Sequence, residues 1–361
     1  MRVLTVNAGS SSLKLSMLDP ADNLLARREV AAVGGRFDAG TVTAALEGLS
    51  APDAVGHRVV HGGREFIAPV RIDEQVERRL HALIDLAPLH QPKSLAGIEA
   101  VRTGLPGVPE VACFDTAFHA TLPDAAATYA IPEPLRQTYG LRRYGFHGLS
   151  HAYAARRAAE LIGAQPPRIV VCHLGAGASL SAVRQGRSID TTMGFTPLEG
   201  LVMATRSGSV DPGMLLWLAE RTELSPAEIS DALEHESGLL ALAGTADMRK
   251  VVEGAEAGEP RAVLALDVYV HRLRAAVAAM AASLGGLDVL VFTGGVGEHA
   301  PEVRRRAAEG LAFLGVALDD DANREVAPDA EVTGRDSVVR TLVIAAREDL
   351  EIAAGVRAVL S

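Results

Sequence analysis

The chain has 361 residues, of which 48% are hydrophobic and 22% charged, as in folded globular proteins, and this length predicts two domains. The net charge of −10 argues against nucleic acid as a partner, because duplex binding depends on lysine and arginine side chains that neutralise phosphates. No segment predicts a signal peptide or a membrane span. Cys113 and Cys172 lie in β-like runs and predict free core thiols in a reducing cytoplasm.

The first two predicted strands are joined by a longer polar turn than a hairpin needs. Alternating apolar residues indicate strands at 4–6 and 13–17, and the join from Asn7 to Ser12 reads N-A-G-S-S-S. Backbone N–H groups in such a turn, with serine hydroxyls and Lys14, suit a phosphate chain. A Walker A loop would lead into a helix, whereas a strand follows here. Taken alone, this stretch is equally consistent with a polar hairpin that binds nothing.

The opening pattern recurs in the second half of the chain. Residues 169–183 again read as strand, glycine turn and strand, and each copy precedes a third extended run, at 24–30 and 187–191. Such self-similarity predicts a duplicated domain. The boundary falls near residue 150, before a helix-like run that Ser150 is placed to cap.

Helical patterns follow the strands in both halves. A capping box at 225–228 with proline at the first helical position predicts a helix there, and further helices are predicted at 259–284, 301–314 and 349–360. Residues 190–213 have no periodicity, and long irregular segments in compact domains are usually functional. Residues 292–299 predict a loop that passes under a nucleotide base or ribose. The whole pattern predicts an α/β fold with a ligand cleft between its halves.

Six motifs in this order resemble the acetokinase family, of the sugar kinase, Hsp70 and actin superfamily. They are N-A-G-S-S-S-x-K at 7–14, H-R-V-V-H-G-G at 57–63, F-D-T-A-F-H at 114–119, Y-G-F-H-G-L-S-H at 144–151, T-M-G-F-T-P-L-E-G-L-V-M-A-T-R-S-G at 192–208, and G-G-V-G-E at 294–298. The chain departs from the family pattern at Ala176, Ser209 and His299, where the family has asparagine, aspartate and asparagine, and it is shorter between residues 20 and 53.

The resemblance implies duplicated actin-like (ribonuclease H-like) ATPase domains with an interdomain cleft. The first domain would comprise residues 1–148 and 350–361, so that the C-terminal helix closes it. The second, residues 149–349, would carry most nucleotide contacts.

The activity that the resemblance implies is reversible, Mg²⁺-dependent transfer of the ATP γ-phosphoryl group to acetate, giving acetyl phosphate and ADP, by a cytoplasmic homodimer. Propionate or another short-chain carboxylate is an alternative acceptor. Such an acid titrates near about 4.3 and is already ionised at pH 7, so the site must supply positive charge rather than a base. A sugar or glycerol kinase would need a base for its hydroxyl, and a non-catalytic actin-like or Hsp70-like nucleotide switch would lack an acceptor pocket.

The resemblance also implies site residues. Arg58 and Arg206 would clamp the carboxylate and the phosphoryl group, and His147 would donate to the equatorial oxygens in the transition state. Asp115 has an acid–base role in the family, whereas the ionised acceptor favours an orienting role.

Substrate would contact Arg58, Val60, Leu89, His90, Phe146 and Pro197. The nucleotide would contact Lys14, Ser10, Ser12, His173, Leu174, Gly175, Ala176, Gly177, Asp247, Met248, Arg249, Gly295, Val296, Gly297, Glu298 and His299. Asn7 and Glu348 would hold Mg²⁺ or, as an alternative, Mn²⁺, through hard oxygen donors.

Overall fold

A computed structural model of the chain describes residues 1–9, 12–31, 37–88, 90–164 and 168–361. These residues form two units, the first made of 1–120, 146–153 and 347–361 and the second of 121–145 and 154–346. Residues 121–145 thus group with the second unit and residues 149–153 and 347–349 with the first, whereas the sequence predicts the reverse for each; the domain boundaries stay a prediction. The predicted site residues Ser10 and Leu89 lie outside the described residues.

The first unit is built on a six-stranded mixed sheet in the order β3-β2-β1-β4-β6-β5. Strands β1, β2 and β3 are antiparallel neighbours, whereas β1, β4 and β6 run parallel. The strands are β1 (Val3–Ala8), β2 (Ser12–Leu18), β3 (Leu24–Ala31), β4 (Ala54–Val59), β5 (Val70–Arg71) and β6 (Glu110–Phe114).

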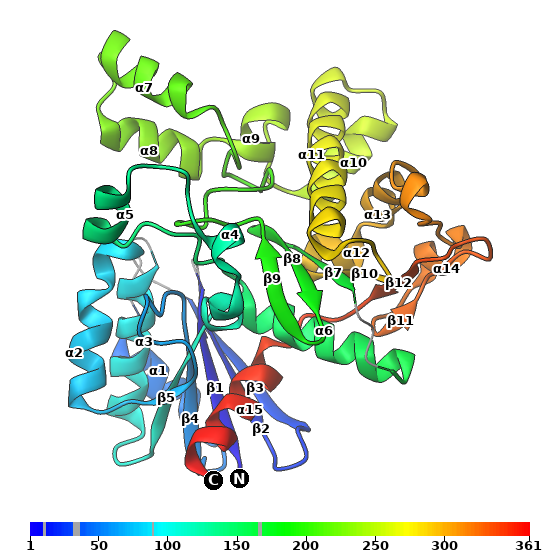
Figure 1. Cartoon of the computed structure of the whole chain (residues 1–361). Helices are drawn as coiled ribbons and strands as arrows, with labels where there is room; N and C mark the ends of the chain where they lie inside the picture. Colours follow the sequence, from blue (N-terminus) through cyan, green and yellow to red (C-terminus); the bar gives the residue numbers. More distant parts are fainter. Residues whose placement is uncertain (10–11, 32–36, 89, 165–167) are drawn as a thin grey trace. The chain divides into compact units, whose positions relative to one another are not determined.

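Helices cover both faces of this sheet (Figure 1) because successive residues of a strand point to opposite faces, and apolar side chains occupy both of them. One face packs Leu4, Val6 and Leu13 against α1 and α3, and the other packs Val3 and Leu18 against α15. The helices are α1 (Ala39–Leu46), α2 (Glu74–Ala82), α3 (Gln91–Gly104) and α15 (Glu348–Leu360), with 3-10 turns η1 (Ile84–Leu86) and η2 (Ala117–Thr121).

The second unit repeats the strand order of the first. Its sheet runs β11-β12-β10-β7-β8-β9, with β7, β8 and β9 antiparallel and β7, β10 and β12 parallel. The series β9-β8-β7-β10-β12 therefore matches β3-β2-β1-β4-β6, and the predicted duplication is confirmed. The strands are β7 (Ile169–Leu174), β8 (Ala178–Arg184), β9 (Arg187–Thr191), β10 (Val289–Thr293), β11 (Ala330–Glu331) and β12 (Arg340–Val343).

The long helix α11 (Pro260–Leu284) packs on β7, β8 and β9 of the second sheet. Helix α6 (Gly148–Ile162) begins among residues of the first unit and continues in the second. The remaining helical elements are α4 (Asp124–Ala127), α5 (Glu133–Tyr139), α7 (Pro212–Arg221), α8 (Pro226–His235), α9 (Gly238–Ala243), α10 (Met248–Glu256), α12 (Gly294–His299), α13 (Pro301–Glu309), η3 (Ala312–Leu314) and α14 (Asp320–Glu325).

Most helices predicted from the sequence are confirmed, and three details are corrected. The capping box at 225–228 is present and begins α8, and residues 192–211 form neither helix nor strand. Ser150 does not cap α6, because this helix already begins at Gly148. The helix predicted at 301–314 ends at Glu309, where a separate 3-10 turn follows, and the loop predicted at 292–299 contains the short helix α12.

Both cysteines are buried and free, as the sequence predicts. Burial raises the pKa of the Cys113 thiol to about 12 and also raises that of Cys172. Within the described part of the chain, none of the helices has the length and apolar character that crossing a membrane requires.

Candidate active site

In the first unit, the residues predicted to handle the acceptor and the metal gather at one edge of the sheet. Asn7 lies near the end of β1, Arg58 near the end of β4 and Asp115 directly after β6. Because these strands are parallel neighbours, their carboxyl ends meet at the same edge, where open α/β sheets usually bind ligands. Glu348, the first residue of α15, joins them there through a hydrogen bond to Asn7.

Arg58 is the centre of this cluster. Its Nε donates to Oδ1 and Oδ2 of Asp115 at 3.0 and 3.1 Å, its Nη2 donates to Oδ2 at 2.6 Å, and its Nη1 donates to Oδ1 of Asn7 at 3.0 Å. Asn7 in turn donates from Nδ2 to Oε2 of Glu348 at 2.7 Å. A guanidinium carries more N–H groups than the described residues take up, so Arg58 retains donors for an anion while its plane is fixed.

The carboxylates in this cluster keep Arg58 charged, while Asp115 itself is under opposing influences. Burial alone would lower the pKa of Arg58, but the carboxylates of Asp115 and Glu348 outweigh it, and the pKa of Arg58 is raised. Burial raises the pKa of Asp115, which is 1% exposed, and nearby Glu348 adds to this, whereas the Arg58 charge and hydrogen bonds oppose it. Arg58 is therefore a permanent positive charge held in one orientation by a buried carboxyl group.

Asn7 and Glu348 form a donor set that fits Mg²⁺. An amide oxygen and a carboxylate are hard ligands, and Mg²⁺ commonly takes one or two protein oxygens beside waters and substrate phosphates. The described residues contain no cluster of three or more His, Cys, Asp and Glu side chains that could hold a metal by themselves. Oδ1 of Asn7 already accepts from Arg58, so an ion held beside Glu348 would take the second lone pair of that oxygen.

Two of the predicted acceptor-pocket residues in the first unit are buried apolar side chains. Val60 follows β4 and is 5% exposed, and Phe146 is 1% exposed with its ring edge-on to His61, the centroids 5.5 Å apart. His90 precedes α3 as its N-cap residue. His147 follows Phe146 and has a φ of 56°, in the left-handed region.

In the second unit, Arg206 lies in the irregular segment 192–211. Its Nε forms an ion pair with Oε2 of Glu234 on α8 at 3.1 Å, and its Nη1 donates to the carbonyl of Pro197 at 3.4 Å. Burial lowers the pKa of Arg206, and Glu234 opposes this. The two predicted residues Arg206 and Pro197 are thus in contact, whereas no motif in the sequence points to Glu234.

The predicted phosphate hairpin lies at the end of β7. The Gly175 N–H donates to the Gly177 carbonyl at 3.0 Å and forms the turn after His173 and Leu174. The carbonyl of Ala176, at the exposed tip, accepts the N–H of Ala204 at 3.1 Å. The hairpin therefore contacts the segment that carries Arg206.

The second predicted nucleotide segment, residues 295–299, lies near this hairpin. Thr293 at the end of β10 pairs with His173, so that α12 begins at the same edge of the sheet. Gly295 on α12 is exposed, whereas Gly297 is buried. Arg304, which lies outside every sequence motif, is 1% exposed and donates from Nη1 to the carbonyls of Gly297 and Glu298 at 2.8 and 2.9 Å.

Other predicted nucleotide contacts are more dispersed. Asp247 caps α10 and accepts the Arg249 N–H at 3.0 Å, while the Arg249 side chain is exposed and Met248 is buried. Lys14 is exposed on β2 opposite Asn7. The hydroxyl of Ser12 donates to Glu29, so this serine is already hydrogen-bonded within its own sheet.

Among the positions that depart from the family pattern, Ser209 forms hydrogen bonds within its own segment. Ser209, where the family has aspartate, accepts the Gly200 N–H at its hydroxyl at 3.0 Å and donates its own N–H to the Gly200 carbonyl at 3.0 Å. His299 ends α12 and is exposed. Ser209 thus closes the irregular segment with neutral hydrogen bonds.

The acetokinase family model matches residues 31–354, most of the chain. The chain belongs to the acetokinase family. Acetokinase-family relatives include acetate kinase from Nostoc punctiforme, 50% identical over 86% of this chain and 77% of its own length, and acetate kinase from Clavibacter sepedonicus, 46% identical over 97% of both chains.

Solved structures of the acetokinase family have the same fold. Acetate kinase from Porphyromonas gingivalis is 35% identical, with a TM-score of 0.90 over 100% of both chains. A propionate kinase from Francisella tularensis is 36% identical, with a TM-score of 0.91 over 98% of both chains. The predicted fold class, duplicated actin-like α/β domains, is confirmed.

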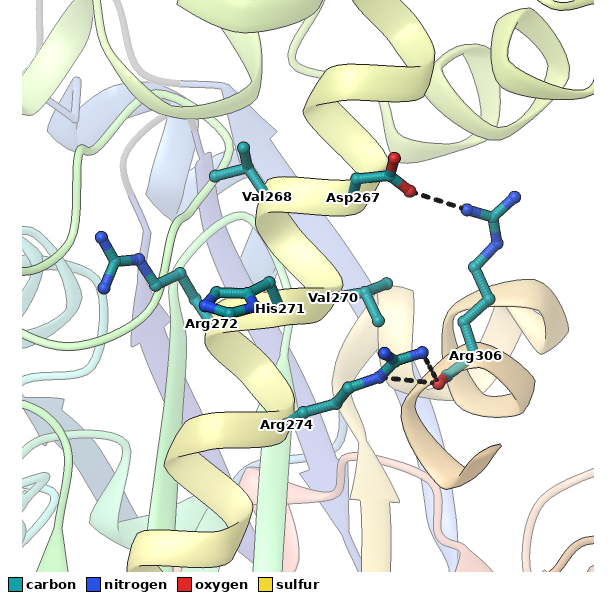
Figure 2. Close-up of a pocket in the computed structure, with 7 residues that line it drawn as sticks. All are labelled: Asp267, Val268, Val270, His271, Arg272, Arg274 and Arg306. Atoms are coloured by element: carbon teal, nitrogen blue, oxygen red, sulfur yellow. Dashed lines mark hydrogen bonds and ion pairs between the residues drawn. The ribbon is translucent and has the colours of Figure 1, made fainter. Parts of the chain in front are cut away.

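A cavity of about 560 Å³ in the second unit is lined by residues of α11 and α13 (Figure 2). Arg274 donates from Nε to the Arg306 carbonyl at 2.9 Å, and Arg306 donates from Nη1 to Asp267 at 3.0 Å. These two arginines therefore join α11 to α13, and the cavity contains none of the residues predicted to bind substrate or nucleotide.

Proposed function

We propose that the protein is an acetate kinase that transfers the γ-phosphoryl group of ATP reversibly to acetate, giving acetyl phosphate and ADP. The observation that carries the proposal is the Arg58 cluster, in which Asp115 and Asn7 fix a permanently charged guanidinium with donors to spare at the carboxyl ends of parallel strands, two residues before the buried Val60. Membership of the acetokinase family supports the same activity. Neither a sugar kinase nor a nucleotide switch would require this arrangement.

Each residue has a role that follows from the charges of the reaction. Acetate and ATP are both anions, so Arg58 would bind the incoming carboxylate and Arg206 the transferring phosphoryl group, which reduces their repulsion. His147 would donate a hydrogen bond to the equatorial oxygens. Asp115 would hold the Arg58 guanidinium in place and take no proton, because the acceptor is already ionised at neutral pH.

We propose that Asn7 and Glu348 hold Mg²⁺, or Mn²⁺ as an alternative, together with the nucleotide phosphates; the ion would neutralise phosphate charge. The adenine nucleotide would lie along residues 173–177 and 295–299, with 247–249 and Lys14 as further contacts. The two buried thiols support a cytoplasmic location, and kinship with the acetokinase family supports a homodimer.

One assay tests this function. Purified protein is incubated with MgATP, hydroxylamine and acetate, propionate or butyrate, and the acyl hydroxamate is measured. We expect acyl phosphate from acetate at the highest kcat/KM, with propionate slower. Preferential reaction with propionate would favour the alternative acceptor, and ATP hydrolysis with no hydroxamate would favour a nucleotide switch.

Val60 provides a test of the acceptor pocket. Val60→Ala is expected to raise the ratio of propionate to acetate kcat/KM by about tenfold, since space for one methylene in an apolar pocket is worth roughly 1–3 kcal/mol. Val59→Ala is the matched control, because it removes the same atoms from the neighbouring valine, whose side chain packs in the core formed by β4, β6 and α3. It should lower the free energy of unfolding and leave the ratio unchanged. An unchanged ratio in Val60→Ala would remove Val60 from the acceptor pocket.

A further inference from the structure

His147 has a backbone conformation that its surroundings must maintain. Its φ of 56° is in the left-handed region, which is unfavourable for a residue with a Cβ. The conformation directs the side chain that would contact the transferring phosphoryl group. Hydrogen bonds on both sides of His147 hold it there.

Both flanks of His147 are bound by one short segment, residues 115–119. On the C-terminal side, the Gly148 N–H donates to the Asp115 carbonyl at 2.9 Å, and a Cβ on Gly148 would lie 2.0 Å from that oxygen. On the N-terminal side, Nε2 of His119 lies 3.0 Å from the Phe146 carbonyl. The peptide groups before and after His147 are therefore attached to the same turn after β6.

His119 is suited to act as a fixed hydrogen-bond donor. A carbonyl can only accept, so Nε2 of His119 carries the hydrogen. The ring is 1% exposed and lies between Phe118 and His151, with centroid distances of 5.5 and 5.6 Å. Burial lowers the pKa of His119 to about 4, although the bond to Phe146 opposes this, so the imidazole stays neutral at physiological pH.

We infer that His119 is a positioning residue, which fixes the Phe146–His147 peptide by its Nε2–H bond and thereby orients the His147 side chain for phosphoryl transfer. The inference rests on the role proposed for His147. The segment that carries His119 also contains Asp115, whose carboxylate fixes Arg58. The turn after β6 thus positions both the His147 imidazole and the Arg58 guanidinium. This gives a reason for the contact between His119, in the F-D-T-A-F-H motif, and the motif that carries His147.

The test compares two substitutions of His119, by glutamine and by methionine, whose side chains have nearly equal length. Glutamine places an amide N–H where Nε2 of histidine lies, whereas methionine fills the same space without a donor. His119→Met is expected to lower kcat on the order of tenfold, as outer-shell partners of functional groups do, with the KM values for acetate and MgATP nearly unchanged. His119→Gln should retain most of the wild-type kcat. Circular dichroism and urea unfolding verify that both variants are folded.

A double-mutant cycle distinguishes positioning from a general loss of structure. If His119 acts through His147, His119→Met in a His147→Ala background should change the remaining kcat by less than about twofold. An equal loss in the glutamine and methionine variants, or a tenfold loss that persists without His147, would overturn the inference. If His119→Met does not fold, His119→Asn replaces it, since the shorter amide does not reach the Phe146 carbonyl.

Failure of the proposed function has a different signature. In that case wild-type protein forms no acyl hydroxamate, or His147→Ala keeps the wild-type kcat. The inference about His119 is overturned separately, by an active wild-type enzyme that needs His147 and tolerates methionine at position 119.

Discussion

Arg58→Ala is expected to lower kcat for acetyl phosphate formation on the order of 10³-fold, the loss typical when one preorganised donor to transition-state charge is removed. In the proposed mechanism Arg58 supplies charge next to the acceptor, and no other described arginine or lysine contacts Asp115 or Asn7. The KM for acetate should also rise, because the ground-state carboxylate loses the same partner. The hydroxamate assay with saturating MgATP measures both quantities.

The same substitution has a cost in stability that must be separated from catalysis. Asp115 is 1% exposed and would be left without its arginine, which typically destabilises a protein by about 3–5 kcal/mol. Arg102→Ala is a matched control, because Arg102 also forms ion pairs with two carboxylates of the first unit, Glu77 and Glu110. These contacts lie away from the proposed site, since Glu110 is at the opposite end of β6 from Asp115. It should unfold at lower urea and keep the wild-type kcat. A folded Arg58→Ala enzyme with near-normal kcat would exclude Arg58 from the mechanism.

The duplicated sheet could be predicted because local patterns specify it. Leu13, Leu15 and Met17 alternate with polar residues, and the two hairpins repeat the same strand and turn signals, so the strand positions follow from periodicity alone. Helix α12 could not be predicted in this way, since three of its six residues are glycines with low helix propensity. It forms where the buried guanidinium of Arg304 binds the Gly297 and Glu298 carbonyls, a contact between residues on two helices.

The start of α6 and the geometry of the site depend on similar distant contacts. Ser150 is a reasonable N-cap by sequence, but the Gly148 N–H is already bound by the Asp115 carbonyl, and the helix starts earlier. Family motifs identified Arg58 and Asp115 as separate residues, whereas their ion pair joins positions 57 residues apart. The partner of Arg206, Glu234, lies on α8 outside any motif. Sequence patterns therefore identify the chemical groups, and tertiary packing determines which of them meet.

Asp115→Asn is expected to lower kcat on the order of 10²-fold, because displacing a reacting group by about 1 Å has an effect of that size. Asparagine nearly preserves the shape of aspartate and keeps one acceptor oxygen, but it loses the charge and the two-oxygen contact with the Arg58 guanidinium. The KM for acetate should rise as well, since Arg58 becomes less well fixed. Both changes are measured in the hydroxamate assay, with unfolding in urea as the check on structure.

The decisive comparison is Asp115→Asn in an Arg58→Ala background. If Asp115 acts only by orienting Arg58, removing its charge after Arg58 is gone should change kcat by less than about twofold, and the double variant should unfold at higher urea than Arg58→Ala, since no unpaired buried carboxylate remains. If Asp115 exchanges a proton with the reacting groups, the two losses should multiply to roughly 10⁵-fold. Acetate needs no base at neutral pH, because it is already a carboxylate with a pKa near about 4.3. We therefore expect the losses to overlap, and full multiplication would establish acid–base catalysis by Asp115.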